Sequence, residues 1–362
     1  MGETGTSSVT SALRTLVAQQ ARRAGGWLPF DRFMALALYA PGLGYYANTS
    51  RKFGALPSQG SDFITAPEMS PLFGATLAVQ VAEALDRTRT AEVWEFGAGT
   101  GALAHQLLAA LGTVVRRYVI VELSASLRER QQALLAPFAD KVEWLAELPP
   151  RIEGVVVGNE VLDAMPVKLL ARRAGQWHER GVDAQLQWSD RATELRPPVD
   201  IAGEHDYLTE IHPQAQAFIR TLADRLERGA AFFIDYGFPE AEYYHPQRAG
   251  GTLMCHRAHM ADAQPLADIG QKDITAHVDF TGIAAAAQDA GLATLGYTSQ
   301  GRFLVNCGLV QAMAAAPQKE QVAAQRLMAE HEMGELFKVL ALHKGAYWDA
   351  AGFREGDRTH TL

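Results

Sequence analysis

Five short apolar segments alternate with helical segments between residues 91 and 236, and this alternation restricts the possible folds more than any other feature. Segments that are apolar almost throughout are typical of strands buried on both faces of a parallel sheet. We therefore predict an α/β fold in which helices cover both sides of such a sheet. The segments are AEVWEF (91–96), YVIVEL (118–123), KVEWL (141–145), GVVVGN (154–159) and AAFFIDY (230–236).

The rest of the chain predicts how the sheet ends and what surrounds it. Residues 293–310 read as two strands joined at Ser299-Gln300-Gly301, which predicts a terminal antiparallel hairpin, and 318–345 carry the apolar stripe of a long helix. A β-meander is expected over 166–193, with Gly175 and Gly181 at its turns. The predicted regions are N-terminal helices with a lid loop at 1–74, a sheet domain at 75–311 with insertions at about 166–215 and 238–282, and a helical tail at 312–362.

Composition and charge narrow the possible functions. The formal net charge is −8 and no block of like charges occurs, which argues against binding to a nucleic-acid backbone. No apolar run approaches the roughly 18 residues of a membrane span, so no membrane insertion is expected. Two cysteines without metal-ligand spacing predict free thiols and no metal site. The opening MGETGTSSVT has no signal or transit pattern, and a cytoplasmic location is expected.

A glycine-rich turn, WEFGAGTGALA at 94–104, follows the first predicted strand. Its Gly97, Gly99 and Gly101, with Thr100 between them, allow a ligand to approach the backbone closely. The turn also fits the dinucleotide pattern G-x-G-x-x-G/A, so a nicotinamide-dependent oxidoreductase is one candidate function.

Glu95 and the end of the sheet favour another cofactor. A carboxylate two residues before Gly97 would repel a pyrophosphate at the helix N-terminus, whereas it would attract the sulfonium and ammonium groups of S-adenosylmethionine. Five parallel strands and a terminal hairpin are the order of class I S-adenosylmethionine-dependent methyltransferases, while a dinucleotide-binding sheet ends in a sixth parallel strand. The sequence therefore predicts a Rossmann-like methyltransferase fold that binds S-adenosylmethionine.

Two further strand ends carry candidate cofactor ligands. Glu122 lies 21 residues after Gly101, at the end of the second predicted strand, where a carboxylate can accept both hydroxyls of a ribose. Leu123 follows it, and Trp144 and Leu145 end the third predicted strand. These three apolar residues are placed to flank an adenine ring, although core packing explains Trp144 and Leu145 equally well.

Several longer motifs resemble the MidA-type methyltransferases, the group that includes the mitochondrial complex I assembly factor acting as a protein arginine methyltransferase. The resemblance implies a protein arginine as the methyl acceptor, on a respiratory complex I subunit. A cofactor-binding assembly factor with little catalysis is the alternative, and no oligomeric state is predicted. The motifs are LYAPGLGYY (38–46), GSDFITAPEMSPLFG (60–74), GNEVLDAMPVK (158–168), DYG (235–237), TAHVDF (275–280), QGRFL (300–304) and EMGELFKVLAL (332–342).

The fourth predicted strand leads into candidate acceptor ligands. It delivers Asn159, expected near the cofactor, and then Glu160 and Asp163, three residues apart. A guanidinium is always charged and pairs with carboxylates, so we expect these two to orient an arginine. The alternative is that Asn159 or Asp163 caps a helix that begins here and Glu160 occupies its first turn.

The predicted lid supplies the remaining candidates. It contains Asp62, Thr65, Glu68 and the pair Tyr45-Tyr46. We expect Thr65 near the cofactor, with Glu68 or Asp62 as the carboxylate beside it. In the second insertion, His277 and Asp279 suit a base and its orienting group, but a structural hydrogen bond is the commoner use of such a pair.

Overall fold

The computed structural model describes residues 3–48, 64–257 and 260–362, which divide into two compact units. The sheet unit consists of Ile64–Leu162, Gln216–Gly237 and Phe280–Leu362. The accessory unit combines the N-terminal segment with residues 163–215 and 238–279. The sheet unit therefore includes the last part of the predicted lid, with Thr65 and Glu68, and its third segment contains the C-terminus.

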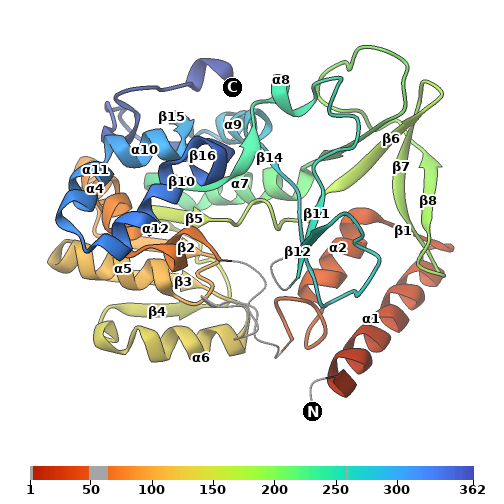
Figure 1. Cartoon of the computed structure of the whole chain (residues 1–362), viewed down its shortest axis with the longest axis horizontal. Coiled ribbons are helices and arrows are strands. Elements are labelled where there is room, and N and C mark those ends of the chain that lie inside the picture. Colours follow the sequence, from red (N-terminus) through yellow and green to blue (C-terminus); the bar gives the residue numbers. More distant parts are fainter. Residues whose placement is uncertain (1–2, 49–63, 258–259) are drawn as a thin grey trace. The chain divides into compact units, whose positions relative to one another are not determined.

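The central sheet of the sheet unit has the strand order β15-β16-β10-β5-β2-β3-β4 (Figure 1). Its first five strands in chain order pair in parallel, whereas β16 is antiparallel to both of its neighbours. Its order agrees with the class I methyltransferase sheet expected from the sequence. The strands are β2 (Glu92–Phe96), β3 (Arg117–Val121), β4 (Val142–Leu145), β5 (Ile152–Asn159), β10 (Leu226–Phe238), β15 (Ala293–Ser299) and β16 (Phe337–Lys344).

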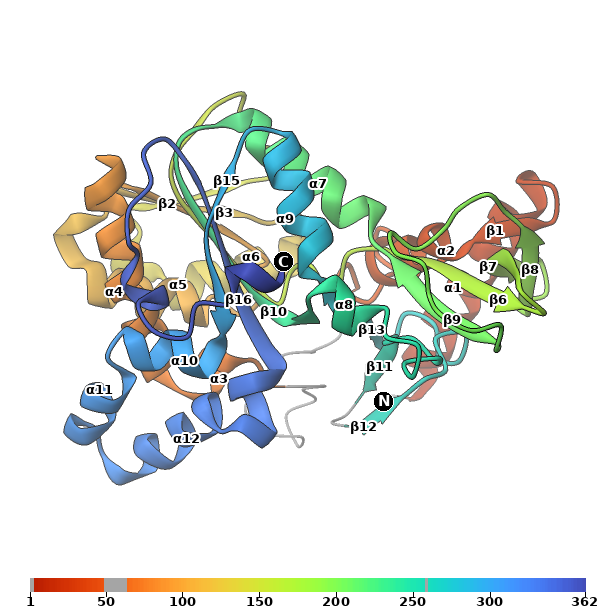
Figure 2. The same cartoon turned by 90° about the horizontal axis from the view of Figure 1, so that it is seen from above.

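Helices cover both faces of this sheet, with α4 and α5 on one side and α7 and α9 on the other (Figure 2). Successive residues of β10 point to opposite faces: Phe232 belongs to the core that holds Phe73 of α4, while Phe233 packs edge-on against Phe218 of α7. This two-sided burial explains the apolar strands. The helices are α3 (Ala66–Met69), α4 (Pro71–Thr88), α5 (Ala102–Leu111), α6 (Ala125–Leu134), α7 (Pro213–Arg225), α9 (Phe280–Asp289), α10 (Gln300–Asn306), α11 (Leu309–Ala315) and α12 (Gln318–Met328).

The terminal antiparallel pair exists and its first predicted strand is β15 (Ala293–Ser299), but the second strand was predicted at the wrong residues. β15 pairs with β16, whereas residues 300–315 form α10 and α11. The predicted helical tail contributes the strand FKVLALHK at 337–344. All its residues but the last are buried, because β16 lies between two other strands. An apolar run without alternation fits a buried strand as well as a helix, which explains the error.

The accessory unit contains a mainly antiparallel sheet of order β1-β7-β6-β9, in which β8 also pairs with β7, and a smaller sheet of order β12-β11-β13. The predicted meander corresponds to β6, β7 and β8. Gly181 is not at a turn but inside β7, where a Cβ would lie 2.3 Å from the Leu28 carbonyl oxygen. The elements are α1 (Glu3–Arg23), β1 (Trp27–Pro29), α2 (Phe30–Tyr39), β6 (Lys168–Arg173), β7 (Gln176–Asp183), β8 (Trp188–Ala192), β9 (Tyr207–Ile211), α8 (Glu240–Tyr243), β11 (Met254–Arg257), β12 (Met260–Asp262), β13 (Asp273–Thr275) and β14 (Val278–Asp279).

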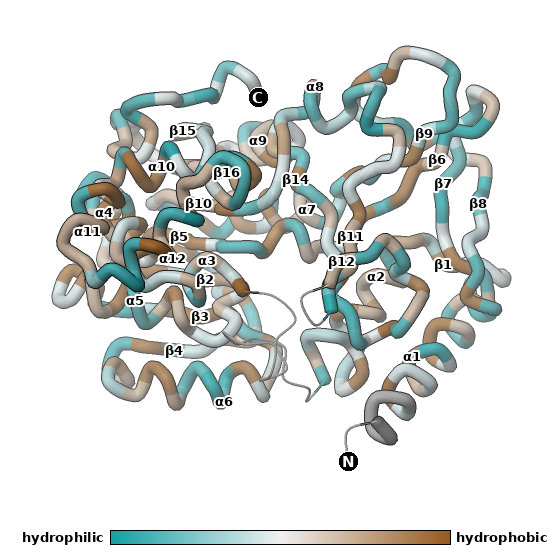
Figure 3. The backbone as a smooth tube through the Cα atoms, in the orientation of Figure 1, coloured by the Kyte–Doolittle hydropathy of each residue, from teal (hydrophilic) through white to brown (hydrophobic). Residues whose placement is uncertain are grey.

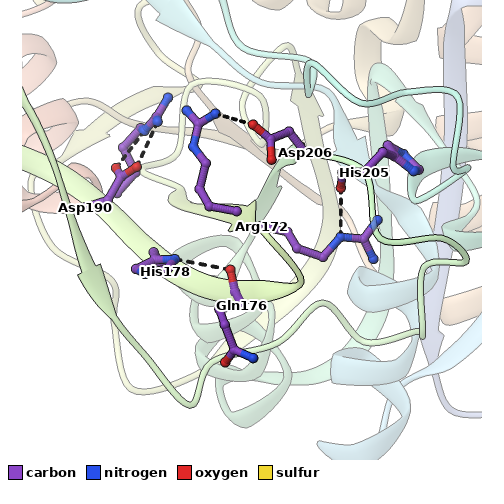
Figure 4. A network of polar contacts seen from close by, with 8 residues as sticks. Arg172, Gln176, His178, Asp190, His205 and Asp206 are labelled. Atoms are coloured by element: carbon purple, nitrogen blue, oxygen red, sulfur yellow. Dashed lines mark hydrogen bonds and ion pairs between the residues drawn. The ribbon is translucent and has the colours of Figure 1, made fainter.

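The accessory unit is held by an apolar core and by a polar network. Leu13, Val17 and Ala21 recur every four residues of α1 and are fully buried, and Figure 3 shows the apolar positions alternating with hydrophilic ones along this helix. Figure 4 shows Arg172 of β6, whose guanidinium donates to the His205 carbonyl oxygen at 3.1 Å. No helix among the described residues is both long and apolar enough to cross a membrane.

Candidate functional site

The glycine turn connects β2 to α5 at the carboxyl edge of the sheet. Gly97, Gly99 and Gly101 have φ values of +64°, +53° and +88°, which favour glycine over residues with a Cβ. A Cβ on Gly97 would also lie 2.8 Å from Val161 Cγ2. The turn therefore needs its glycines for backbone conformation and, at Gly97, for space.

Glu95 lies at the end of β2 and is almost completely buried. Its Oε2 accepts a hydrogen bond of 2.6 Å from the Tyr118 hydroxyl of β3. Burial raises the pKa of Glu95 to about 7, and the nearby charge of Glu122 adds to this rise. A cation placed beside Glu95 would favour its ionised form.

Glu122 follows β3 and lies 9% exposed beside the glycine turn. Its Oε1 accepts from the Ser124 backbone amide at 2.8 Å, and its Oε2 accepts from Gln131 Nε2 at 3.0 Å. Burial raises the pKa of Glu122, and these hydrogen bonds oppose the rise. The Leu123 amide is a third donor to this carboxyl, and a carboxylate has about four acceptor positions, so Glu122 keeps the capacity to accept a further donor.

The ends of β3 and β4 lie side by side, since the Glu122 amide donates to the Leu145 carbonyl oxygen at 3.0 Å. Leu123 is 80% exposed, an unusual state for leucine, whereas Leu145 is half-buried. The Trp144 indole donates from Nε1 to Gln131 Oε1 at 2.9 Å. The structure thus brings the predicted ribose and adenine residues together at one edge of the sheet.

The short helix α3 places Thr65 and Glu68 beside the glycine turn. Glu68 Oε1 accepts from the Thr100 hydroxyl at 3.1 Å, and the Thr65 amide donates to Glu68 Oε2 at 3.4 Å. Burial raises the pKa of Glu68 in spite of these bonds. Asp62 lies outside the described residues. Tyr45 and Tyr46 belong to the accessory unit, where the Tyr46 hydroxyl donates to Asp273.

Glu160 directly follows β5 and combines an uncommon backbone with a perturbed carboxyl. Its φ is +53°, a left-handed conformation that is rare outside glycine. Burial, followed by the charge of Asp235, raises its pKa to about 8, although its carboxyl accepts hydrogen bonds from Asn159 and the Ala66 amide. The Asn159 bond, from Nδ2 to Glu160 Oε1, measures 3.0 Å, and the buried Asn159 Oδ1 has no hydrogen-bond partner. Charge from Glu68 raises this pKa further.

Glu160 and Asp163 are separated by bends and turns, because no helix begins after β5. The alternative reading as a helix cap and first turn therefore does not apply, while a joint role of the two carboxylates in holding an acceptor stays a prediction. Asp163 belongs to the accessory unit, where its carbonyl oxygen accepts from the Ala276 amide at 3.0 Å.

Asp235 is the carboxylate that the structure places beside Glu160. Its Oδ2 accepts from the backbone amides of Val161 and Leu162 at 3.1 and 2.8 Å, which fixes the chain just after Glu160. The sequence contained a signal for Asp235. It is the second-last residue of the apolar segment AAFFIDY, just as Glu122 is the second-last residue of YVIVEL. Gln131 was also missed, and nothing in the polar sequence of α6 marks it as buried.

His277 and Asp279 lie in the accessory unit. The His277 ring stacks on Phe238, with 5.3 Å between centroids, and Asp279 accepts from the Tyr244 hydroxyl at 3.3 Å. These contacts agree with the structural use of the pair. Among the described residues, no group of three or more His, Cys, Asp or Glu side chains is arranged to hold a metal ion.

Comparison with known proteins identifies the family. The family model described as S-adenosyl-L-methionine-dependent methyltransferase matches residues 75–298. The chain belongs to this family. It is therefore an enzyme that uses S-adenosylmethionine, and the nicotinamide alternative is set aside.

Solved structures and curated relatives extend the likeness over nearly the whole chain. A protein from Burkholderia thailandensis, bound to S-adenosyl-homocysteine, is 48% identical with a TM-score of 0.94, covering 99% of this chain and 98% of its own. The human and Caenorhabditis elegans relatives are named mitochondrial protein arginine methyltransferases. They are 28% and 26% identical, covering 94% and 88% of this chain and 85% and 84% of their own lengths.

Proposed function

We propose that S-adenosylmethionine binds this methyltransferase along the carboxyl edge of the sheet. Glu122 would hold the ribose hydroxyls, because its carboxylate retains acceptor capacity beside the glycine turn, and Leu123 and Leu145 would flank the adenine. The unpartnered Asn159 Oδ1 suits the ammonium of the methionine part. The other residues proposed to line the site are Glu95, Gly97, Gly99, Thr100, Gly101, Thr65 and Glu68.

We infer that the methyl acceptor is an arginine of a protein. The observation that carries this inference is the carboxylate cluster formed by Glu160, Asp235 and Glu68, in which the charges of the latter two raise the pKa of Glu160. Asp235 is buried and Glu160 and Glu68 are half-buried, and three acidic groups so close together are costly unless a cation joins them. A guanidinium stays charged and can pair with two carboxylates at once, and the names of the curated relatives agree with this acceptor.

In this proposal the ionised Glu160 holds the guanidinium and aims one of its nitrogens. Bound S-adenosylmethionine would supply a methyl group from its sulfonium centre to the acceptor nitrogen, with the sulfur keeping the electron pair of the C–S bond. The methylated nitrogen then loses a proton, for which the Glu160 carboxylate is an acceptor. Asp235 acts through the backbone that it fixes at Val161 and Leu162. Positioning of this kind accounts for much of the rate of a displacement reaction.

The identity of the acceptor protein and the location of the enzyme are finer proposals. A respiratory complex I subunit follows from the resemblance alone. A cytoplasmic location is supported by Cys255 and Cys307, which are both free and buried, as expected in a reducing compartment.

One experiment tests the acceptor class directly. The enzyme is incubated with methyl-labelled S-adenosylmethionine and a cell lysate, and labelled residues are identified by mass spectrometry. Label on arginine in the wild type, lost in Glu160→Gln, supports the proposal, while Glu147→Gln, an exposed carboxylate, serves as control. Label on lysine or on a small molecule would overturn it, and cofactor binding without transfer would favour an assembly factor.

A further inference from the structure

Gln131 connects three separate parts of the proposed cofactor site. It projects from α6 and is 0% exposed. Its Nε2 donates to the Gly99 carbonyl oxygen at 2.9 Å and to Glu122 Oε2 at 3.0 Å, while its Oε1 accepts from Trp144 Nε1 at 2.9 Å. One side chain thus links the glycine turn, the carboxylate after β3 and the end of β4.

The chemistry of its partners fixes the orientation of this amide. A carbonyl oxygen and a carboxylate can only accept, and an indole N–H can only donate. Exchanging the nitrogen and oxygen of Gln131 would therefore set acceptor against acceptor on one side and donor against donor on the other. The network admits one orientation, which is the criterion for assigning a glutamine amide.

Each contact of Gln131 restricts a group that would otherwise rotate. Peptide units are planar and trans, so holding the Gly99 carbonyl also fixes the Thr100 N–H, which points away from Gln131. The bond from Gln131 to Oε2 helps to fix the rotation of the Glu122 carboxylate about its last torsion, together with the amides of Ser124, on Oε1, and Leu123. In addition, a Cβ on Gly101 would lie 3.4 Å from Gln131 Cγ, so the side chain packs directly against the turn.

We propose that Gln131 is a positioning residue for cofactor binding, which acts by holding the Glu122 carboxylate in the orientation that accepts the ribose hydroxyls. This inference rests on the proposed roles of the glycine turn and Glu122. The ordinary alternative is that Gln131 only anchors α6 to the sheet, because it and Leu127 are the buried residues of that helix. The two roles differ in what they predict for cofactor analogues.

The test uses calorimetric titration of the whole protein with S-adenosylhomocysteine and with its 2′-deoxyribose analogue. Gln131→Met keeps the size of the side chain and removes its three hydrogen bonds. We expect this variant to bind S-adenosylhomocysteine about tenfold more weakly and to lose most of the preference for the ribose compound. Equal weakening for both ligands, or unchanged binding, would overturn the proposal.

Two further sets of variants keep the result decisive. Gln80→Met is the matched control, because Gln80 is equally buried and its amide also bonds at both ends: it donates to Glu83 and accepts from the Gly352 amide. This variant should alter thermal stability and leave the ligand preference unchanged. If Gln131→Met does not fold, Gln131→Glu retains the acceptor for Trp144 but cannot donate when ionised, and it should lose the same preference.

Glu122→Gln separates this inference from the assignment on which it depends. If Glu122→Gln keeps the full preference for ribose, the assignment of Glu122 is wrong. If Glu122→Gln loses the preference while Gln131→Met keeps it, only the role of Gln131 fails. If both single variants lose the preference, the double variant should bind S-adenosylhomocysteine only slightly more weakly than either of them, because the two residues act through one contact.

Discussion

The raised pKa of Glu160 predicts that Glu160→Gln stabilises the protein, and that it does so more strongly as the pH rises. The pKa is about 8 in the folded chain, against an ordinary value of 4.5. Between these values the unfolded chain releases a proton that the folded chain keeps, so stability falls as the pH rises. Glutamine cannot ionise, so the variant escapes this loss.

The size of the effect follows from the two pKa values. One pKa unit corresponds to about 1.4 kcal/mol, and the interval from 4.5 to about 8 gives an upper limit of ~5 kcal/mol at or above pH 8. Water entry and local rearrangement reduce such penalties in real proteins. We therefore expect Glu160→Gln to gain ~2 kcal/mol at pH 8 and almost nothing at pH 4.5.

Urea unfolding at several pH values measures this gain. Wild type, Glu160→Gln and the exposed control Glu147→Gln are compared at each pH, so that other titrating groups cancel. The stability difference between Glu160→Gln and wild type should grow from pH 4.5 to 8, while the control stays level. A variant that is destabilised equally at all pH values would refute the reasoning, since it would show that the carboxyl is ionised throughout.

Four more predictions follow from the same edge of the sheet. Glu122→Ala should bind S-adenosylmethionine at least tenfold more weakly by calorimetry, because each hydrogen bond to a charged acceptor contributes roughly 1.5–3 kcal/mol; unchanged affinity would exclude a ribose contact. Because the pKa of Glu95 is about 7, affinity for the cationic cofactor should rise from pH 6 to 8 as this carboxyl ionises, and Glu95→Gln should flatten the curve. Gly99→Val should abolish binding, since φ is +53° there and a branched side chain would meet the ligand. Asp235→Asn should lower the pKa of Glu160, measured by carbon NMR of labelled glutamate, because it removes a repelling charge; an unchanged value would remove Asp235 from the cluster.

The sequence predicted which polar residues gather at the carboxyl edge of the sheet, because parallel strands share one polarity. Their carboxyl ends meet at a single edge, so polar residues that follow apolar segments come together there without further information. Glu95, Glu122 and Asn159 were placed at this edge by this rule, and their contacts with the cofactor stay a prediction. Gln131 was not, because burial of a polar residue on a helix depends on the surface that the helix meets, and that surface belongs to distant strands.

The errors had a common physical origin in segments whose local pattern fits two structures. The strand FKVLALHK reads as a helix until β10 and β15 are known to flank it. The same ambiguity affected the alternative helix start after Asn159, since Asn159 and Asp163 are residue types that cap helices. The backbone instead bends at Glu160, because Asp235 accepts the amides of the next two residues, and that contact spans more than seventy positions of the chain.

Two features of Glu160, its backbone conformation and its carboxyl group, each lower the stability of the folded chain. Their occurrence at one residue is the strongest physical argument that Glu160 holds a cationic acceptor. A left-handed backbone at a non-glycine residue costs of order 1–3 kcal/mol, and glycine would remove that cost. A carboxyl with a raised pKa opposes folding at neutral pH, and glutamine would remove that cost as well. The carboxylate is not needed for hydrogen bonding within the site, because a glutamine at this position could also accept from Asn159 and Ala66. What glutamine and glycine cannot provide is a negative charge held in a fixed direction, and a cationic acceptor is the ligand that uses it.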